Sequence, residues 1–302
     1  MDLRQLAMVV AIVDEGGFTS AADALELSQP SVSQAVRALE VELGVELFHR
    51  AGRTVRLTAA GEALIGPARQ AVRDAATARA AVAEVAGLTA GHLDLVSLAT
   101  LAVSPTAELI GRFRQAHPGV TVRLAEPDDP GAIGDHLRTG QSEIGIAELP
   151  LPGPDLESHP IETQDFVALL PPATTRAAGP ITLLVLARHP LITTPPGTST
   201  RRQADDAFAA RGLTPTIAVE TEHREVIVSL VLAGAGVSIL PRPVAAEAAD
   251  RGASVRELRP RITREIGLVH RQGTLSPAAQ AFVALAIPGR PATTERPPAR
   301  RR

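Results

Sequence analysis

The sequence predicts a multidomain α/β protein: a small N-terminal domain, a long connecting helix, and a larger α/β domain in two halves. Three observations predict this arrangement: the length of 302 residues, an alanine-rich helical stretch after residue 58, and alternating strand and helix patterns from His92 onward. A chain of this length exceeds one ordinary domain of about 100–200 residues. We therefore expect at least two hydrophobic cores.

The composition restricts the possible chemistry and compartment. The chain has no Cys, which excludes disulfides, thiolate metal sites and a cysteine nucleophile and suits a reducing compartment. The net charge is −3 and every basic residue is Arg, so the total charge indicates no particular partner. The longest uncharged run, residues 226–241, is too short to cross a bilayer, and no signal-peptide pattern follows Met1. We expect a soluble cytoplasmic protein without membrane contact.

The first 44 residues predict three short helices. Apolar residues recur at three- and four-residue spacing over residues 3–14, as in an amphipathic helix. A run of small residues at 21–25 predicts a second helix, and residues 29–43 a third. Ser28 suits the N-cap of the third helix, Pro30 its first turn, and Gly44 its end.

The third helix carries small and hydrogen-bonding side chains opposite its apolar stripe. A face of this kind fits the major groove of DNA, where hydroxyl, amide and guanidinium groups pair with base edges or phosphates. Ordinary solvent exposure stays open as the alternative for this helix alone, because Ser, Gln and Arg are common on surfaces. The face comprises Pro30, Ser31, Gln34, Arg37 and Ala38, with Ser33 on its flank.

A β-hairpin follows over residues 47–57, with arginines near its tip. Residues 1–60 contain five Arg and eight acidic residues, yet three of those Arg lie within residues 50–56. Beside a docked helix, Arg50 and Arg53 would reach phosphates or a narrow minor groove. Helices followed by such a wing predict a reader of double-stranded DNA.

An ordered series of motifs runs through this region, and further motifs follow in the second half of the chain. It comprises Gly17-Phe18-Thr19-Ser20-Ala21-Ala22, Leu27-Ser28-Gln29-Pro30-Ser31-Val32-Ser33, Leu39-Glu40, Leu43-Gly44, Leu47-Phe48, Arg50, Leu57-Thr58, Ala60-Gly61, Pro190-Leu191-Ile192-Thr193 and residues 231–241. Over about residues 1–287 the chain resembles the LysR-type transcriptional regulators. The resemblance implies a winged helix-turn-helix. Its implied DNA-binding residues are Gln29, Pro30, Ser31, Ser33, Gln34 and Arg37 on the recognition helix and Arg50 and Arg53 on the wing. Position 34 varies in that family, so base preference does not transfer.

The stretch after the wing predicts one long helix over residues 59–88. Residues 59–86 contain twelve Ala, and Thr58 suits its N-cap. Apolar residues keep a coiled-coil spacing at Leu64, Ala68, Ala71, Ala75, Ala78, Val82 and Val85. At about 40 Å the helix is longer than the small core beside it, which favours pairing with a second chain over lying on its own domain. The resemblance implies a homodimer through this helix, and a homotetramer stays open.

The remainder predicts alternating strands and helices in two halves, which favours a mainly parallel sheet covered on both faces. The resemblance implies a two-lobed effector-binding domain like periplasmic binding proteins, with crossing strands near residues 158–162 and 262–266. Residues 173–179 look trimmed relative to the family. The expected domains are 1–58 (winged helix-turn-helix), 59–88 (linker helix), 89–288 (effector domain, lobe 1 about 91–160 and 266–288, lobe 2 about 161–265) and 289–302 (disordered Arg/Pro-rich tail).

Two segments are expected to face each other across the cleft and to bind a small effector. Thr100 ends the first strand of the domain, and Thr198, Ser199, Thr200 and Arg201 open a helix. A helix N-terminus with hydroxyls and an arginine suits a carboxylate or similar anion, although plain helix capping explains the same residues. Glu220 or His223 would select an effector with a hydrogen-bond donor, with a solvated helix start as the alternative. Asp128 and Asp129 are interpreted as turn residues.

An enzymatic function lacks support in the sequence. The chain contains no Gly-x-Ser-x-Gly elbow, no phosphate-binding Gly-rich loop ending in Lys, and no His-Glu-x-x-His motif. His117, His159 and His189 directly precede Pro and are interpreted as markers of element boundaries. We therefore expect no catalytic residue, no metal and no cofactor. The alternative function is a solute-binding or sequestering protein that uses its N-terminal helices for assembly only, and a third is a ligand-independent repressor.

Overall fold

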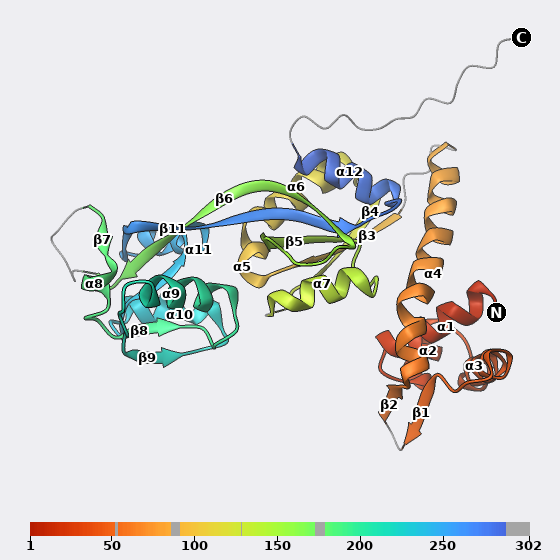
Figure 1. Ribbon diagram of the computed structural model, residues 1–302. Coiled ribbons are helices and arrows are strands. Elements are labelled where there is room, and N and C mark those ends of the chain that lie inside the picture. The colour runs from red at the N-terminus through yellow and green to blue at the C-terminus, as the bar shows by residue number, and fades with distance from the viewer. Residues whose placement is uncertain (52–53, 86–90, 128, 173–178, 288–302) are drawn as a thin grey trace, which may run out of the picture.

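The computed structural model describes residues 1–51, 54–85, 91–127, 129–172 and 179–287. A helical N-terminal unit with a hairpin leads into the long helix α4, and two α/β lobes follow side by side (Figure 1). None of the helices in these ranges is both long and apolar enough to cross a membrane.

The N-terminal unit contains the predicted helices and wing. The helices are α1 (Leu3–Asp14), α2 (Phe18–Ala24) and α3 (Gln29–Leu43), and strands β1 (Phe48–Ala51) and β2 (Thr54–Leu57) form an antiparallel hairpin. The Ser28 hydroxyl accepts a hydrogen bond from the Ser31 amide at 3.3 Å, and Gly44 ends α3 with a φ of 71°. Both predicted ends of α3 are therefore confirmed.

A compact apolar core holds these helices against the hairpin. Val9, Ile12, Val36 and Leu39 are completely buried, and Phe48 of β1 packs edge-on against Phe18 with ring centroids 5.5 Å apart. The core thereby fixes the orientation of the wing relative to α3, because the base of the hairpin is anchored in it.

Helix α4 (Ala59–Val85) continues from the hairpin and includes Pro67. The Thr58 hydroxyl accepts from the Gly61 amide at 3.1 Å, as the predicted cap. The two ends of the predicted apolar seam differ in exposure. Ala68 is buried against the N-terminal core, whereas Val82 is 71% exposed. Arg69 further ties the first half of α4 to Asp14 of α1. Within the described residues, Val82 in the second half of the helix is the exposed large apolar side chain of this seam.

Lobe 1 consists of a sheet with helices on its faces. Its elements are β3 (Gly91–Ser97), α5 (Ala99–Leu101), the π-helical turn η1 (Ala102–Thr106), α6 (Ala107–Ala116), β4 (Val120–Ala125), α7 (Pro130–Arg138), β5 (Ile144–Leu149) and α12 (Pro277–Ala286). Its core draws on residues 93–147 and again on residues 266–286, so it is built from two distant pieces of chain.

Lobe 2 lies between these two pieces in sequence. Its elements are β7 (Ile181–Thr182), α8 (Leu183–Leu186), β8 (Leu191–Thr193), α9 (Ser199–Ala209), β9 (Ile217–Glu220), α10 (Arg224–Leu232), β10 (Ser238–Pro241) and α11 (Arg242–Asp250). Its two core clusters use residues from Phe166 to Ile262.

Two long strands, β6 (Leu156–Leu170) and β11 (Ser254–Arg271), run through both lobes (Figure 1). The sheet order is β10-β6-β11-β5-β3-β4, with β7 paired to β11. Strand β3 pairs in parallel with β4 and β5, but β6 and β11 are antiparallel to each other, as are β10 to β6 and β11 to β5. The sheet is therefore mixed, because the chain crosses between the lobes in both directions.

Candidate DNA interface and effector cleft

The predicted DNA-contacting face of α3 is open to solvent. Gln29, Pro30, Ser31, Gln34 and Arg37 are exposed, and Ser33 is half-buried. The Gln29 amide donates to the Ser33 hydroxyl at 2.9 Å, so these two side chains brace each other along the helix. Gln34 and Arg37 follow on the same helix with exposed amide and guanidinium groups.

The wing presents polar residues on strands held by its apolar base. Phe48 pairs with Leu57 in register, and His49 pairs with Arg56 at the next position. Both His49 and Arg56 are exposed, and Arg56 was not among the predicted contacts although it belongs to the same basic cluster. Arg53 lies outside the described residues, and for Arg50 only the backbone is described, opposite Val55.

Helix α3 and the wing lie on the outer edges of the N-terminal unit in Figure 1, away from the two lobes. Neither surface is covered by another part of the chain that the structure describes. A duplex could therefore approach both without displacing a lobe.

The predicted cleft residues Thr100 and Ser199 meet at a buried arginine that the sequence analysis missed. Arg264 of β11 donates to the Thr100 hydroxyl at 3.2 Å and to the Ser199 hydroxyl at 3.1 Å. Its Nε also donates to Gln164 Oε1 at 3.0 Å, and Gln164 is its cross-strand neighbour on β6. One side chain thus joins α5 of lobe 1, α9 of lobe 2 and both connecting strands.

Arg264 is only 2% exposed and lies over the ring of Phe166, 5.2 Å from its centroid. A strand places alternate residues on one face, and Ile262 and Ile266 flank Arg264 on the buried face. An arginine between two buried isoleucines at that spacing is a signal in the sequence for a functional or structural cation. Which face of β11 is buried depends on its pairing with β6 and β5, which the local spacing does not contain.

The predicted residues in the first turn of α9 have different roles in the structure. Thr198 is the N-cap: its hydroxyl accepts from the Arg201 amide at 3.4 Å and pairs with the Thr194 hydroxyl at 2.6 Å. The Thr200 hydroxyl is buried and has no hydrogen-bond partner among the described residues. A buried hydroxyl in this situation is expected to pair with a ligand or a water.

Arg201 turns toward carboxylates of its own lobe. It contacts Asp205 at 2.8 Å and Glu220 at 3.1 Å, so Glu220 is joined to it as an ion pair. Burial lowers the pKa of Arg201, but hydrogen bonds to Asp205 and Glu220 outweigh it and raise the pKa above its ordinary value. Its charge is thus already compensated, and an effector anion would have to compete with both carboxylates.

A carboxylate from lobe 1 also reaches the start of α9. Glu148, near the end of β5, accepts from the Ser199 hydroxyl, from Gln203 at 2.6 Å and from Arg202 at 3.2 Å. A cavity of about 470 Å³ opens beside it, lined by Arg202 together with the start of α7 and residues 149–152. Side chains in the first turns of α9 therefore bind a carboxylate, here one supplied by the protein itself.

The remaining candidates lie at turns and helix ends. His223 is exposed at the N-cap position of α10, and its amide donates to the Thr221 hydroxyl at 3.1 Å. Asp129 caps α7 by accepting from the Gly131 amide at 2.9 Å, as expected of a turn residue, whereas Asp128 lies outside the described residues. Most of the loop at 173–179 and the tail at 289–302 also lie outside the described residues.

Glu162 lies on β6, two residues before Gln164, which is the cross-strand partner of Arg264. Burial raises the pKa of Glu162, and the nearby carboxylate of Glu108 raises it further, while Arg264 opposes the change.

Both halves of the chain match models of one bacterial family. The model described as "Bacterial regulatory helix-turn-helix protein, lysR family" matches residues 3–62, and the model "LysR substrate binding domain" matches residues 86–288. The probable HTH-type transcriptional regulator LrrA of Synechococcus elongatus is 34% identical over 243 residues, covering 80% of this chain and 81% of LrrA.

Solved structures agree over nearly the whole length. A full-length OxyR variant from Pseudomonas aeruginosa aligns with a TM-score of 0.77 and 28% identity, covering 95% of this chain and 93% of that chain. Full-length CbnR, solved in complex with its target DNA, aligns with a TM-score of 0.65 and 25% identity, covering 95% of this chain and 99% of that chain. The chain therefore belongs to the LysR family of bacterial transcriptional regulators and carries both the helix-turn-helix and the substrate-binding domain of that family.

Proposed function

We propose that the N-terminal unit reads an interrupted palindrome in promoter DNA, with α3 in the major groove and the wing on the flanking backbone. The observation that carries the proposal is the solvent-exposed polar face of α3 beside a hairpin with exposed His49 and Arg56. The likeness to CbnR, solved on its target DNA, supports it. The protein would act in the cytoplasm by binding alone, without a catalytic step.

Footprinting on the DNA upstream of the protein's own gene tests the proposal. We expect protection at two symmetric half-sites, because a two-fold dimer presents two equivalent readers. Equal affinity for random and upstream DNA would instead favour the solute-binding alternative.

Two substitutions separate base reading from phosphate contact. Gln34→Ala is expected to relax base preference at one position of each half-site by about 1–3 kcal/mol. Arg53→Ala is expected to weaken binding to all sequences and to lower the slope of log affinity against log salt by about 1. Titrations by fluorescence anisotropy at several salt concentrations measure both, with Arg188→Ala, an exposed arginine of lobe 2, as control. Identical effects of Gln34→Ala and Arg53→Ala on every sequence would contradict these roles.

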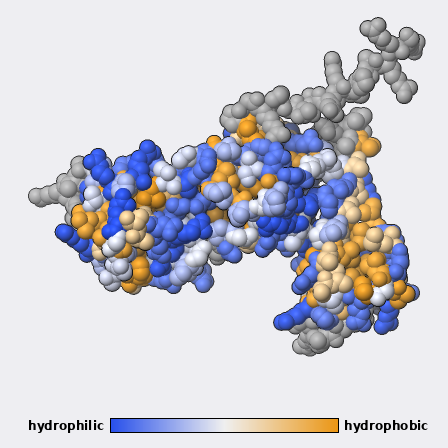
Figure 2. All heavy atoms as spheres, in the orientation of Figure 1, coloured by the Kyte–Doolittle hydropathy of each residue, from blue (hydrophilic) through white to orange (hydrophobic). Residues whose placement is uncertain are grey.

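The dimer is proposed to form through the second half of α4. Val82 is 71% exposed there, and apolar side chains gather on the visible face of the N-terminal unit and α4 in Figure 2. A helix that carries such an exposed apolar residue is suited to pairing with its copy. Ala68 of the N-terminal half is buried within the chain and so does not contribute to this interface.

Val82→Asp is expected to weaken dimerisation by at least about tenfold, because two like charges would meet in an apolar seam. Sedimentation equilibrium measures the dissociation constant. Val103→Asp places the same charge at a residue of lobe 1 that is 56% exposed and should leave it unchanged. A dimer constant unaffected by Val82→Asp would rule out pairing through this part of α4.

The effector is proposed to be a small anion bound near Arg264, where the Thr100 and Ser199 hydroxyls meet, with Thr200 following Ser199 in the first turn of α9. The unpartnered Thr200 hydroxyl and the cation at the lobe junction support this proposal, and Glu148 illustrates the chemistry accepted there. Binding would alter the lobe junction and, through the dimer, the spacing of the two DNA readers.

A further inference from the structure

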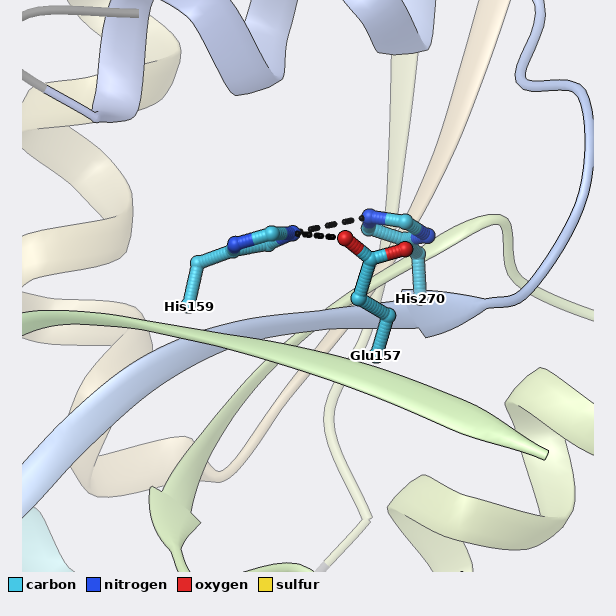
Figure 3. Close-up of side chains that lie close together, drawn as sticks. All are labelled: Glu157, His159 and His270. Carbon is cyan, nitrogen blue, oxygen red and sulfur yellow. Dashed lines mark hydrogen bonds and ion pairs between the residues drawn. The ribbon is translucent and has the colours of Figure 1, made fainter. Parts of the chain in front are cut away.

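Three metal-ligating side chains lie together at the lobe 1 end of the connecting strands, away from the cleft and the DNA-reading surfaces. Figure 3 shows Glu157 and His159 of β6 pointing toward His270 of β11. His270 is paired with Glu157 in the strand register, and His159 is two residues along β6. Since strand residues two apart share one face, the register itself brings the three groups together.

The distances between the ligand atoms match those around one small metal ion. His159 Nε2 lies 3.1 Å from His270 Nε2 and 3.3 Å from Glu157 Oε1, and all three ligand atoms fall within 4.8 Å of one another. In a tetrahedral zinc site with bonds of about 2.0–2.1 Å, neighbouring ligand atoms are about 3.3–3.4 Å apart. The cluster therefore needs only small adjustments to surround such an ion.

The second nitrogen of His270 is held as in many metal sites. Its Nδ1 lies 2.7 Å from the carbonyl oxygen of Arg271, which can only accept, so Nδ1 carries the proton. In the neutral ring the Nε2 lone pair then faces His159, and the stacked rings keep it there with centroids 5.2 Å apart. A backbone carbonyl on the far nitrogen is the usual outer partner of a metal-bound histidine.

We propose that Glu157, His159 and His270 bind a zinc ion, with a water in the fourth position. Two imidazole nitrogens and one carboxylate suit Zn²⁺ or Co²⁺, whereas Mg²⁺ and Ca²⁺ require oxygen ligands. Without metal, the His159 Nε2 proton lies between the rings. On binding, His159 takes its Nδ1–H tautomer, so that both Nε2 lone pairs face the ion.

The site has an open approach and a defined mechanical position. The Glu157 side chain is 47% exposed, which gives the ion a path from solvent, whereas His270 is 4% exposed. A bound ion would fasten the first residues of β6 to the last residues of β11. These are the two strands that continue into lobe 2, so the metal would stiffen the base from which that lobe extends.

Isothermal titration of the untagged full-length protein with ZnCl₂, after removal of metals by a chelator, tests the site. We expect one saturable high-affinity ion per chain, visible absorption bands of tetrahedral Co²⁺ when CoCl₂ replaces zinc, and a higher Tm with zinc. His159→Ala and Glu157→Gln should each weaken zinc binding more than about tenfold, since loss of even an outer-shell partner costs about 10–100-fold. These two positions are more exposed than His270, so their variants are expected to fold.

His189→Gln in lobe 2 is the matched control, because it removes a histidine remote from the cluster and should leave the titration unchanged. Absence of saturable binding would overturn the proposal. So would tight binding that survives both His159→Ala and Glu157→Gln, because the ion would then sit elsewhere and the two histidines would form only a hydrogen-bonded pair.

Discussion

Gly61→Ala is expected to remove sequence-specific DNA binding almost completely. Gly61 lies in the first turn of α4, and a Cβ there would come within 2.2 Å of the Leu47 carbonyl oxygen and 2.7 Å of a Leu57 methyl group. Backbone cannot yield as a flexible side chain does, so α4 and the base of the wing would have to separate. We expect a loss of stability above about 2 kcal/mol and operator binding at least about tenfold weaker.

A second helical glycine serves as the control for the steric effect expected at Gly61. Gly111 in α6 has nothing within 4 Å of the same Cβ position, and Gly111→Ala should be neutral or stabilising by up to about 1 kcal/mol. Thermal unfolding and anisotropy titrations of both variants measure the contrast. Wild-type operator affinity in Gly61→Ala would show that α4 and the wing need not touch in the DNA-reading form.

Arg264→Met is expected to have the largest effect on the lobe junction. The substitution removes the donors that serve Thr100, Ser199 and Gln164, which come from three different elements. Hydrogen bonds from a charged donor contribute about 1.5–3 kcal/mol each, but the two hydroxyls can partly pair with each other. We therefore expect a loss of about 2–4 kcal/mol in the stability of the lobes. Any effector-induced change in Tm should be lost as well.

Arg264→Lys refines this prediction. It keeps the charge, but a single ammonium cannot reproduce the planar fork that reaches several acceptors, so only part of the stability should return. Urea unfolding followed by circular dichroism compares the variants, with Arg188→Ala within about 0.5 kcal/mol of the wild type. If Arg264→Met unfolds at the wild-type urea concentration, the lobes are held by apolar packing and not by this arginine.

Local signals predicted the N-terminal unit closely. The expected helix over residues 3–14 is α1, and Ser28 and Gly44 bound α3 as their side-chain chemistry dictates. Caps and helical periodicity are properties of neighbouring residues, so one sequence contains them. The extent of β6 was not predictable in this way. The strand continues through Pro160 because it pairs with β11, whose residues at that point lie more than a hundred positions later in the sequence.

Strand register also explains what was missed in the candidate sites. His159 was interpreted as a boundary residue because Pro160 follows it, yet it lies within a strand and meets His270. Arg264 likewise gains its partners from β6, α5 and α9, none of which is near it in sequence. Thr100 and Ser199 were identified correctly as neighbours across the lobes because the resemblance supplied the fold that sequence spacing could not.

The division of lobe 1 into two pieces of chain has a consequence for synthesis on the ribosome. Its core includes Ile266, Leu268 and Phe282, which emerge only after every residue of lobe 2. Lobe 2 can therefore fold first. Until β11 is synthesised, β3, β4 and β5 form an incomplete sheet with an unpaired edge. A nascent chain is most vulnerable to aggregation or proteolysis in that interval. A chain that ends before residue 266 would never complete the core of lobe 1.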